Sequence, residues 1–158
     1  MSAMQSFQEQ YPEEFSHCYG CGSANDHGLH IRSFWDGDVS VCDFEPRPYH
    51  TSFPGFVYGG LIASVVDCHS TGTAAAAAYR AEGREFGSEP PLRFVTASLK
   101  VDYLKPTPID APMRLRSKIR EIKERKVVVD TEVTVGGVIC ARGEVVAVKI
   151  PDTMRLGK

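Results

Sequence analysis

The sequence predicts an α+β fold in which one long helix is wrapped by a curved, mostly antiparallel sheet. A stretch of small residues between Gly59 and Tyr79 favours a single helix, and its run of five alanines at 74–78 has a high helix propensity. Segments that alternate apolar and polar residues flank this helix, two before it and about four after it. Because short turns separate most of these segments, antiparallel pairing is expected.

Two strands are expected ahead of the helix. The segments Leu29–Phe34 and Asp38–Phe44 alternate in polarity, and Asp36 and Gly37 between them are typical of a hairpin turn. Three prolines between positions 46 and 54 then exclude regular strand pairing, because proline lacks the backbone N–H. A loop is therefore expected between the second strand and the helix.

The remaining strands are expected after a charged loop at 80–91 that is rich in Gly and Pro. The pair Gly136 and Gly137 predicts a hairpin turn between the last two strands. The expected strands are Leu92–Leu104, Met113–Glu121, Val127–Val135 and Val138–Ile150.

Composition indicates an ordinary globular chain. The 158 residues are 42% hydrophobic and 24% charged, with a formal net charge of -2, which gives no general affinity for nucleic acid. This length suits one domain, 1–158, with residues 1–16 as a polar N-terminal leader. The leader lacks the pattern of a signal peptide and no stretch is apolar enough to span a membrane, so a cytoplasmic protein without nucleic acid or membrane partners is expected.

The five cysteines are an odd number without a secretory signal, and reduced thiols are expected. Cys18 and Cys21, beside His17, have the spacing of half a zinc site. A second Cys-x2-Cys pair is absent, however, and Gly20 and Gly22 favour a glycine-rich turn that holds two small buried thiols. No metal and no cofactor are predicted.

The strongest candidate site lies between His50 and Ala78. Gly59 and Gly60 allow a sharp turn and close approach of a ligand, and the unpaired N–H groups of a helix N-terminus can polarise a carbonyl. Asp67 follows about two helical turns later among apolar neighbours, which suggests a partly desolvated carboxylate. The alternative is a solvated aspartate on a helix that follows an ordinary turn.

The stretch HTSFPGFVYGGLIASVVD resembles the segment N-xx-G-xx-HGG-(six residues)-D of the hotdog-fold acyl-CoA thioesterases, with Gly55, Gly59, Gly60 and Asp67 on its glycines and its acid. TASLKVDYLKPTP, residues 96–108, is similar to the strand that precedes the family's Y-x-x-P turn. HCYGCGSANDHGLHIR, residues 17–32, is similar to the C-x-x-C-G-xx-N-xx-G-L opening of some members. The resemblance implies a hotdog fold with its long central helix.

The resemblance also implies roles for particular residues. Asp67 would act as general base on water or as nucleophile, and the Gly59 amide would polarise the thioester carbonyl. Thr96 falls where relatives hold the attacking water, although threonine is also a common strand residue. Tyr58 replaces the family's His and could donate to the carbonyl, or could be a core or interface tyrosine.

Substrate contacts are expected from the loop and from a basic turn. Ser52 replaces the family's Asn, His50 keeps a His that some members have two residues earlier, and Gly60 supports the turn. Arg125 and Lys126 are expected to contact the phosphates of coenzyme A. The alternating cations at 114–120 could instead form a solvated face on an edge strand.

The function implied by the resemblance is hydrolysis of an acyl-CoA to an acid and free coenzyme A. The resemblance further implies a homodimer that shares its active sites, with pairing into a homotetramer as an extension. Two alternatives stay open: a hotdog hydratase or dehydratase, and a non-catalytic hotdog protein that binds acyl-CoA or another ligand. The acyl group is left open, since Phe53, Phe56 and Phe94 suit an aromatic or a medium aliphatic chain.

Overall fold

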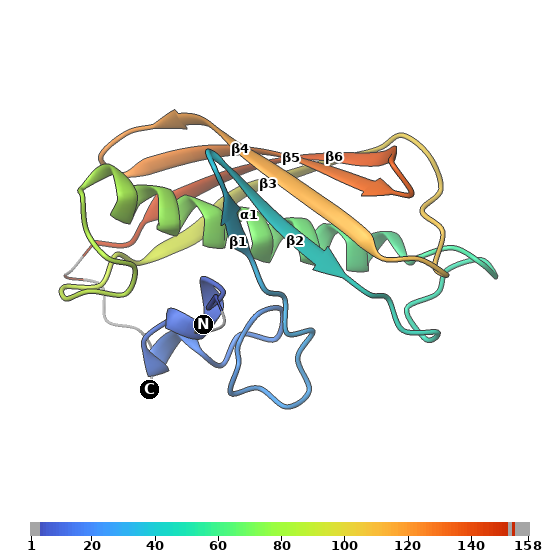
Figure 1. The fold of residues 1–158 in the computed structure, drawn as a ribbon, viewed down its shortest axis with the longest axis horizontal. Helices are drawn as coiled ribbons and strands as arrows, with labels where there is room; N and C mark the ends of the chain where they lie inside the picture. Colours follow the sequence, from blue (N-terminus) through green and yellow to red (C-terminus); the bar gives the residue numbers. More distant parts are fainter. Residues whose placement is uncertain (1–3, 152, 154–158) are drawn as a thin grey trace.

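The computed structural model describes residues 4–151 and 153. One long helix lies across the concave face of a six-stranded antiparallel sheet with the order β1-β2-β4-β5-β6-β3 (Figure 1). The elements are α1 (Gly59–Ala81) and the strands β1 (Phe34–Asp36), β2 (Val39–Phe44), β3 (Phe94–Tyr103), β4 (Met113–Ile122), β5 (Lys126–Val135) and β6 (Val138–Lys149).

The helix is buried on most of its circumference, with Val65, Val66 and Ala74 fully covered. The sheet can approach it closely because β6 has a glycine opposite the helix. A Cβ added at Gly143 would lie 2.4 Å from the Cγ1 of Val66, so a side chain there would push the sheet away. Only a narrow face that includes Gly60, Ser64, Asp67 and Thr71 stays partly exposed.

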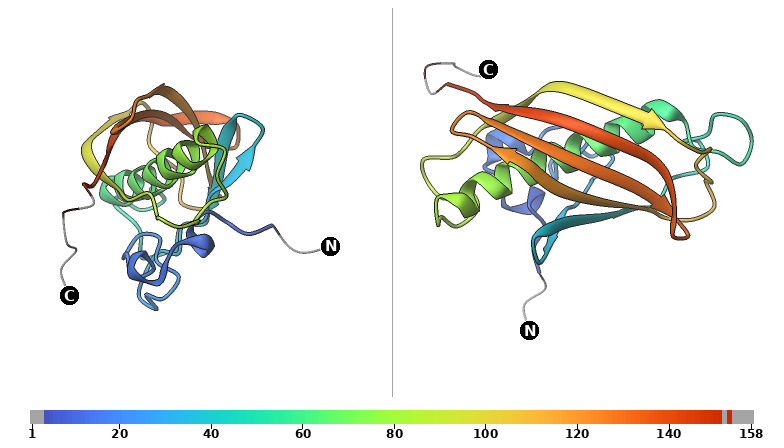
Figure 2. Two further views of the ribbon diagram at one scale, coloured as in Figure 1. Left: turned by 90° about the vertical axis from the view of Figure 1, so that its left-hand side faces the viewer. Right: turned by 90° about the horizontal axis from the view of Figure 1, so that it is seen from above.

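The N-terminal segment covers the side of α1 that the sheet leaves open (Figure 2). Its two short 3-10 turns, η1 (Gln8–Gln10) and η2 (Glu13–Phe15), precede the turn that contains Cys18 and Cys21. Phe7 is buried and its amide donates to the Ser33 carbonyl at 2.9 Å. Although its sequence is polar, the described part of this leader is packed against the helix, where Gln8 and Tyr11 lie over Gly72.

The prediction of four strands after the helix is confirmed, with ends that differ by one or two residues, and so are the helix and the Gly136–Gly137 turn. The prediction of a strand over Leu29–Phe34 is wrong, because β1 begins only at Phe34. The Leu29 and Ile31 amides donate instead to the Tyr19 and Gly20 carbonyls, and His30 has a φ of 53°. Backbone groups committed to the cysteine turn cannot pair with β2.

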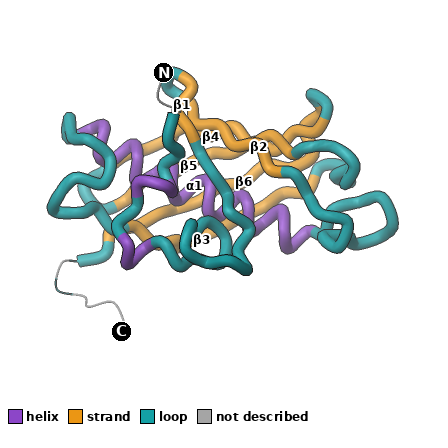
Figure 3. The backbone as a smooth tube through the Cα atoms, turned by 60° about the horizontal axis from the view of Figure 1, so that its bottom comes forward, coloured by secondary structure: helices purple, strands orange, loops and turns teal. Residues whose placement is uncertain are grey.

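The two long connections beside the helix lie at opposite ends of the molecule (Figure 3). Residues 45–58 lead into the helix N-terminus, and residues 82–93 lead from its C-terminus into β3. Each connection contributes to a different pocket. Among residues 4–151 and 153, no helix is long and apolar enough to cross a membrane.

Candidate active site

Asp67 lies in the wall of a cavity of about 380 Å³ between the middle of α1, the start of β3 and the N-terminal segment, here called the Asp67 pocket. The carboxylate is partly buried, as its apolar neighbours in the sequence predict. Most of the wall is apolar, so a charged group in it is weakly solvated and open to a bound ligand. The lining includes Tyr11, Phe15, Cys18, Cys21, Asp67, Cys68, Thr71, Tyr79, Phe86, Leu92, Arg93, Phe94 and Thr96.

Thr96 holds the carboxylate of Asp67 in place. Its hydroxyl donates to the Asp67 Oδ1 at 2.6 Å and lies 2.8 Å from the Thr71 hydroxyl. Since a hydroxyl has one proton, Thr71 must donate to Thr96. Among the described residues, only Thr96 donates a hydrogen bond to the Asp67 carboxylate. A β-bulge between Thr96 and Ser98 interrupts the pairing of β3 with β6 at this point, and such bulges often re-aim a side chain beside a site.

The helix N-terminus presents a pair of amides. Among the described residues, no backbone acceptor pairs with the Gly59 or Gly60 N–H, whereas the Tyr58 carbonyl accepts from Leu61 at 3.1 Å. The Tyr103 hydroxyl donates to the Gly59 carbonyl at 2.7 Å and fixes this turn. A Cβ on Gly60 would lie 2.5 Å from the Tyr58 ring, so only glycine lets that exposed ring lie over the turn.

Gly59 belongs to a second cavity of about 530 Å³, here called the Gly59 pocket, and is separated from Asp67 along the helix. Ser52 lines it, and its amide donates to the Phe56 carbonyl at 2.9 Å. His50 does not line it, because its Nδ1 accepts from the Arg47 amide at 2.9 Å. Burial, followed by the charge of Arg47, lowers the pKa of His50. Tyr58 lines neither pocket.

The structure therefore divides the predicted residues into groups. Asp67 and Thr96 meet in one pocket, and Ser52 and Gly59 meet in the other. The phenylalanines divide in the same way, with Phe94 in the Asp67 pocket and Phe53 and Phe56 in the Gly59 pocket. Within one chain, the predicted carbonyl donor and the predicted carboxylate do not share a cavity.

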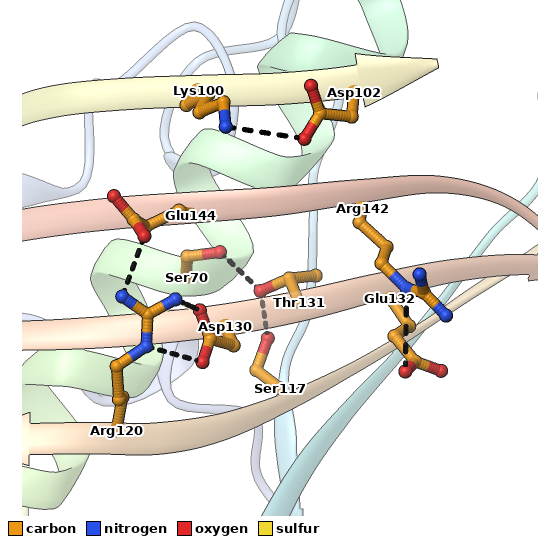
Figure 4. A network of polar contacts seen from close by, with 10 residues as sticks. All are labelled: Ser70, Lys100, Asp102, Ser117, Arg120, Asp130, Thr131, Glu132, Arg142 and Glu144. Atoms are coloured by element: carbon orange, nitrogen blue, oxygen red, sulfur yellow. Dashed lines mark hydrogen bonds and ion pairs between the residues drawn. The ribbon is translucent and has the colours of Figure 1, made fainter. Parts of the chain in front are cut away.

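The basic residues occupy two places. Arg125 and Lys126 lie at the turn between β4 and β5, where the Lys126 Nζ is 3.5 Å from Glu121, and they line neither pocket. The cations at 114–120 lie on β4, which is flanked by β2 and β5. The alternative that placed them on an edge strand is therefore wrong. Most of these cations pair with acids of other strands, as Arg120 does with Asp130 and Glu144 (Figure 4).

His69 points away from the site, as its helical spacing from Asp67 predicts. It is completely buried between the helix and the sheet, with its Nδ1 2.7 Å from the Ser33 hydroxyl and its Nε2 3.3 Å from the Ser40 hydroxyl. Burial lowers the pKa of His69 to about 3, so the ring is neutral. His69 therefore links α1 to Ser33, which precedes β1, and to Ser40 on β2.

Sequence reasoning missed three features of the Asp67 pocket. The aromatic residues Tyr11 and Phe15 of the leader form part of its wall. Arg93 also lines it, with a guanidinium nitrogen 2.8 Å from Glu14. Cys68 brings a third thiol beside Cys18 and Cys21, and Cys18 is exposed where a buried thiol was expected. Only the Cys-x2-Cys spacing gave a sequence signal for this group.

The three thiols hydrogen-bond to one another, and these contacts shift their pKa values in different directions. Hydrogen bonds from the Cys21 and Cys68 thiols lower the pKa of the Cys18 thiol, and the amides of Cys21 and Gly20 act in the same direction. The pKa values of Cys21 and Cys68 are raised, chiefly because they hydrogen-bond to Cys18. All five cysteines of the chain are free.

A sequence profile described as the thioesterase superfamily matches residues 54–141. The acyl-coenzyme A thioesterases THEM4 of Xenopus laevis and of Rattus norvegicus are 40% identical over 87 residues and 34% identical over 89 residues. These matches cover 55% and 56% of this chain but 33% of each relative. The matched part thus spans about a third of the length of these curated relatives.

A solved structure supports the same relationship over more of the chain. A thioesterase superfamily protein from Shewanella loihica shares 47% sequence identity and superimposes with a TM-score of 0.65. The superposition covers 81% of this chain and 97% of that protein. The range matched by the family profile, residues 54–141, contains Asp67 and Thr96.

Proposed function

Because this chain belongs to the thioesterase superfamily, we propose that it hydrolyses an acyl-CoA thioester to a carboxylic acid and free coenzyme A. The observation that carries the proposal is the Asp67 carboxylate, partly buried in a mostly apolar pocket and held by the Thr96 hydroxyl at 2.6 Å. A carboxylate fixed in this way can act repeatedly from one orientation, which is what a base or nucleophile requires. Relatives named acyl-coenzyme A thioesterases support the substrate class.

The chemistry has two routes that use the same carboxylate. In one, Asp67 takes a proton from a water that attacks the thioester carbon, and that proton later reaches the departing thiolate. In the other, Asp67 attacks the carbon itself and the coenzyme A thiolate leaves, which gives a mixed anhydride. Water then hydrolyses the anhydride to release the carboxylic acid and regenerate Asp67. In both routes the free Asp67 Oδ2 faces the reacting atom while Thr96 holds Oδ1. Thr96 is a positioning residue in this arrangement.

The Asp67 pocket suits the acyl group of the substrate. Its cavity of about 380 Å³ is lined by the rings of Phe15, Phe86 and Phe94. Apolar walls of this kind favour an aromatic or a medium-length aliphatic acyl chain through burial of its surface. The charged coenzyme A portion would then extend out of the pocket towards solvent.

A homodimer is proposed because one chain does not bring both catalytic groups together. Gly59 precedes Asp67 by eight residues, which corresponds to about 12 Å along a helix. A carbonyl that contacts the Gly59 amide is therefore out of reach of Asp67 in the same chain, whereas a second copy related by a two-fold axis can supply the missing group.

The surface around the site supports this assembly. The partly exposed helix face that contains Asp67 lies next to β3, which is an edge strand with an unpaired side. Val95 and Leu99 on that strand are 45% and 39% exposed. Exposed apolar residues on an open strand edge are typical of a surface that pairs with another chain.

Arg125 and Lys126 are proposed to contact the phosphates of coenzyme A. Their turn lies at the end of the sheet where Thr96 is found, because Lys126 pairs with Val148 on β6 and Thr96 pairs with the adjacent Ala147. Both residues are at least partly exposed, and the guanidinium and ammonium groups can contact a phosphate without a large desolvation cost.

A panel of acyl-CoA esters, assayed by release of free thiol, tests the proposed function. We expect turnover with at least one aromatic or medium-chain ester. If no ester releases thiol at any enzyme concentration while acyl-CoA still binds, the chain is a binding protein. Light scattering at micromolar concentration tests the assembly, and a monomer mass would contradict the shared site.

A further inference from the structure

Three thiols from two distant segments meet in the wall of the Asp67 pocket. Cys18 and Cys21 lie on the turn ahead of β1, and Cys68 lies on α1 directly after Asp67. Their Sγ atoms all lie within 4.8 Å of one another. We propose that these three sulfurs form a binding site for a thiophilic metal ion, with zinc as the expected occupant.

The spacing of the sulfurs fits metal ligation. A zinc ion with Zn–S bonds of about 2.3 Å and tetrahedral geometry separates its sulfur ligands by about 3.8 Å. The Cys18 and Cys68 sulfurs are 3.8 Å apart. A disulfide needs about 2.05 Å, so the thiols are arranged as neighbouring ligands and not as a bonded pair.

The turn is shaped by two glycines around the sulfurs. A Cβ on Gly20 would lie 2.3 Å from the Cys68 Sγ, so any side chain there would displace the third sulfur from the group. A Cβ on Gly22 would lie 2.4 Å from the Cys18 amide nitrogen, and the Gly22 amide closes the turn by donating to the Cys18 carbonyl at 2.8 Å. Both cysteines of the turn are thereby directed to the sulfur of the helix.

The site offers three protein ligands and one open position. In the part of the chain that the structure describes, no His, Asp, Glu or further Cys joins the group. All three cysteines line the Asp67 pocket, so a water from the pocket can occupy the fourth position. Sites with three protein ligands keep such an exchangeable position, whereas closed structural sites use four.

Metal binding would tie the N-terminal segment to the helix. Cys18 belongs to the segment that forms one wall of the pocket, and Cys68 belongs to the helix that forms another. A bound ion joins these two walls and should stabilise the pocket and the fold. Binding must also displace thiol protons, because thiolates are the ligands.

Cobalt titration of the full, anaerobically reduced and chelator-treated chain provides the test. Thiolate ligation produces a charge-transfer band in the near ultraviolet, and tetrahedral cobalt produces intense visible bands. We expect both signals to saturate at one ion per chain, with zinc displacing the cobalt. Zinc should also raise the thermal midpoint of the folded chain, a readout that is independent of any hydrolase activity.

Variants separate the site from other thiols. Cys18→Ser and Cys68→Ser should each weaken binding by at least about a hundredfold, since each removes one of three ligands. Cys140→Ala, which removes a buried thiol outside the group, should bind cobalt as the parent does. Circular dichroism checks the fold, and the exposed position of Cys18 makes its variant safe for folding.

Two results would overturn the proposal. The first is a fully reduced chain with five titratable thiols that shows no thiolate-to-cobalt band. The second is unchanged cobalt affinity in both the Cys18→Ser and the Cys68→Ser variants. Rapid formation of one disulfide per chain by a reduced protein that binds no metal would instead identify the group as a redox pair.

Discussion

The Thr96 hydroxyl donates to the Asp67 Oδ1 at 2.6 Å, across 29 residues of sequence and from strand to helix. This contact fixes one oxygen of a carboxylate that lines the Asp67 pocket. A second hydroxyl, that of Thr71, lies 2.8 Å from Thr96 and completes a chain of donors that ends on the carboxylate.

Asp67→Asn should abolish turnover while the protein stays folded. The amide keeps the size of the carboxylate but cannot act as a base or nucleophile, so kcat should fall by at least about a hundredfold. The thermal midpoint should stay level or rise, because a partly desolvated charge is replaced by a neutral group. Thiol-release kinetics and calorimetry measure both effects, and Asp102→Asn, at an exposed position on β3, is the control.

Thr96→Val should lower kcat roughly tenfold with little change in KM. The substitution keeps the branched shape but removes a hydrogen bond to a charged group, which is worth about 1.5 kcal/mol or more. Thr96→Ser keeps the hydroxyl and should restore most of the lost rate. Equal activity of the Val and Ser variants would show that the hydroxyl does not position Asp67.

Gly59→Pro should remove the proposed carbonyl donor without breaking the helix. Proline is well tolerated at the first helical residue, and Tyr58 before it is already extended, with φ and ψ of -61° and 130°. Loss of one oxyanion donor costs roughly a hundredfold to a thousandfold in kcat. Gly59→Ala keeps the N–H, and its Cβ would lie at an ordinary 3.5 Å from the Tyr103 ring, so this control should stay active.

The Gly59→Pro and Asp67→Asn variants together test whether two chains share each active site. An equal mixture of unfolded Gly59→Pro and Asp67→Asn chains, refolded together, should recover about a quarter of the parental activity, because half of the dimers then contain one intact site. Each variant refolded alone should stay inactive. Failure to recover activity from a mixture that forms mixed dimers would place both groups in one chain.

Arg125→Ala combined with Lys126→Ala should raise KM for acyl-CoA more than it lowers kcat. Phosphate contacts far from the thioester stabilise the ground state and the transition state alike. Added salt should produce a similar defect in the parent through screening. Arg114→Ala combined with Arg116→Ala removes two cations that pair with acids on β1 and β2 and should leave KM unchanged.

The stability of the fold should decrease as the pH falls below about 6.5, through His69. Its folded pKa of about 3 lies below the ordinary value of 6.5, so between these values the unfolded chain binds a proton that the folded chain does not. The free energy of unfolding should therefore fall by about 2 kcal/mol between pH 8 and pH 5 from this group alone. Urea denaturation of the parent and of His69→Gln measures it, and the variant should show the shallower decrease.

The sequence by itself determined the main architecture. Small residues after Gly59 specified one buried helix, and alternation along four later segments specified the long strands, because these patterns depend only on neighbouring residues and their periodicity. The placement of Gly59 and Asp67 on the same helix could also be predicted from the sequence. The partial burial of Asp67 followed from its apolar neighbours.

Only the tertiary structure decided which of these residues meet. Thr96 reaches Asp67 because a bulge in β3 lies next to the helix, and Cys68 joins Cys18 because the N-terminal segment folds back over the helix. The short β1 has the same origin, since its expected first residues bond to the cysteine turn. Contacts between residues 29 to 50 positions apart depend on the packing of whole elements, and local periodicity carries no information about them.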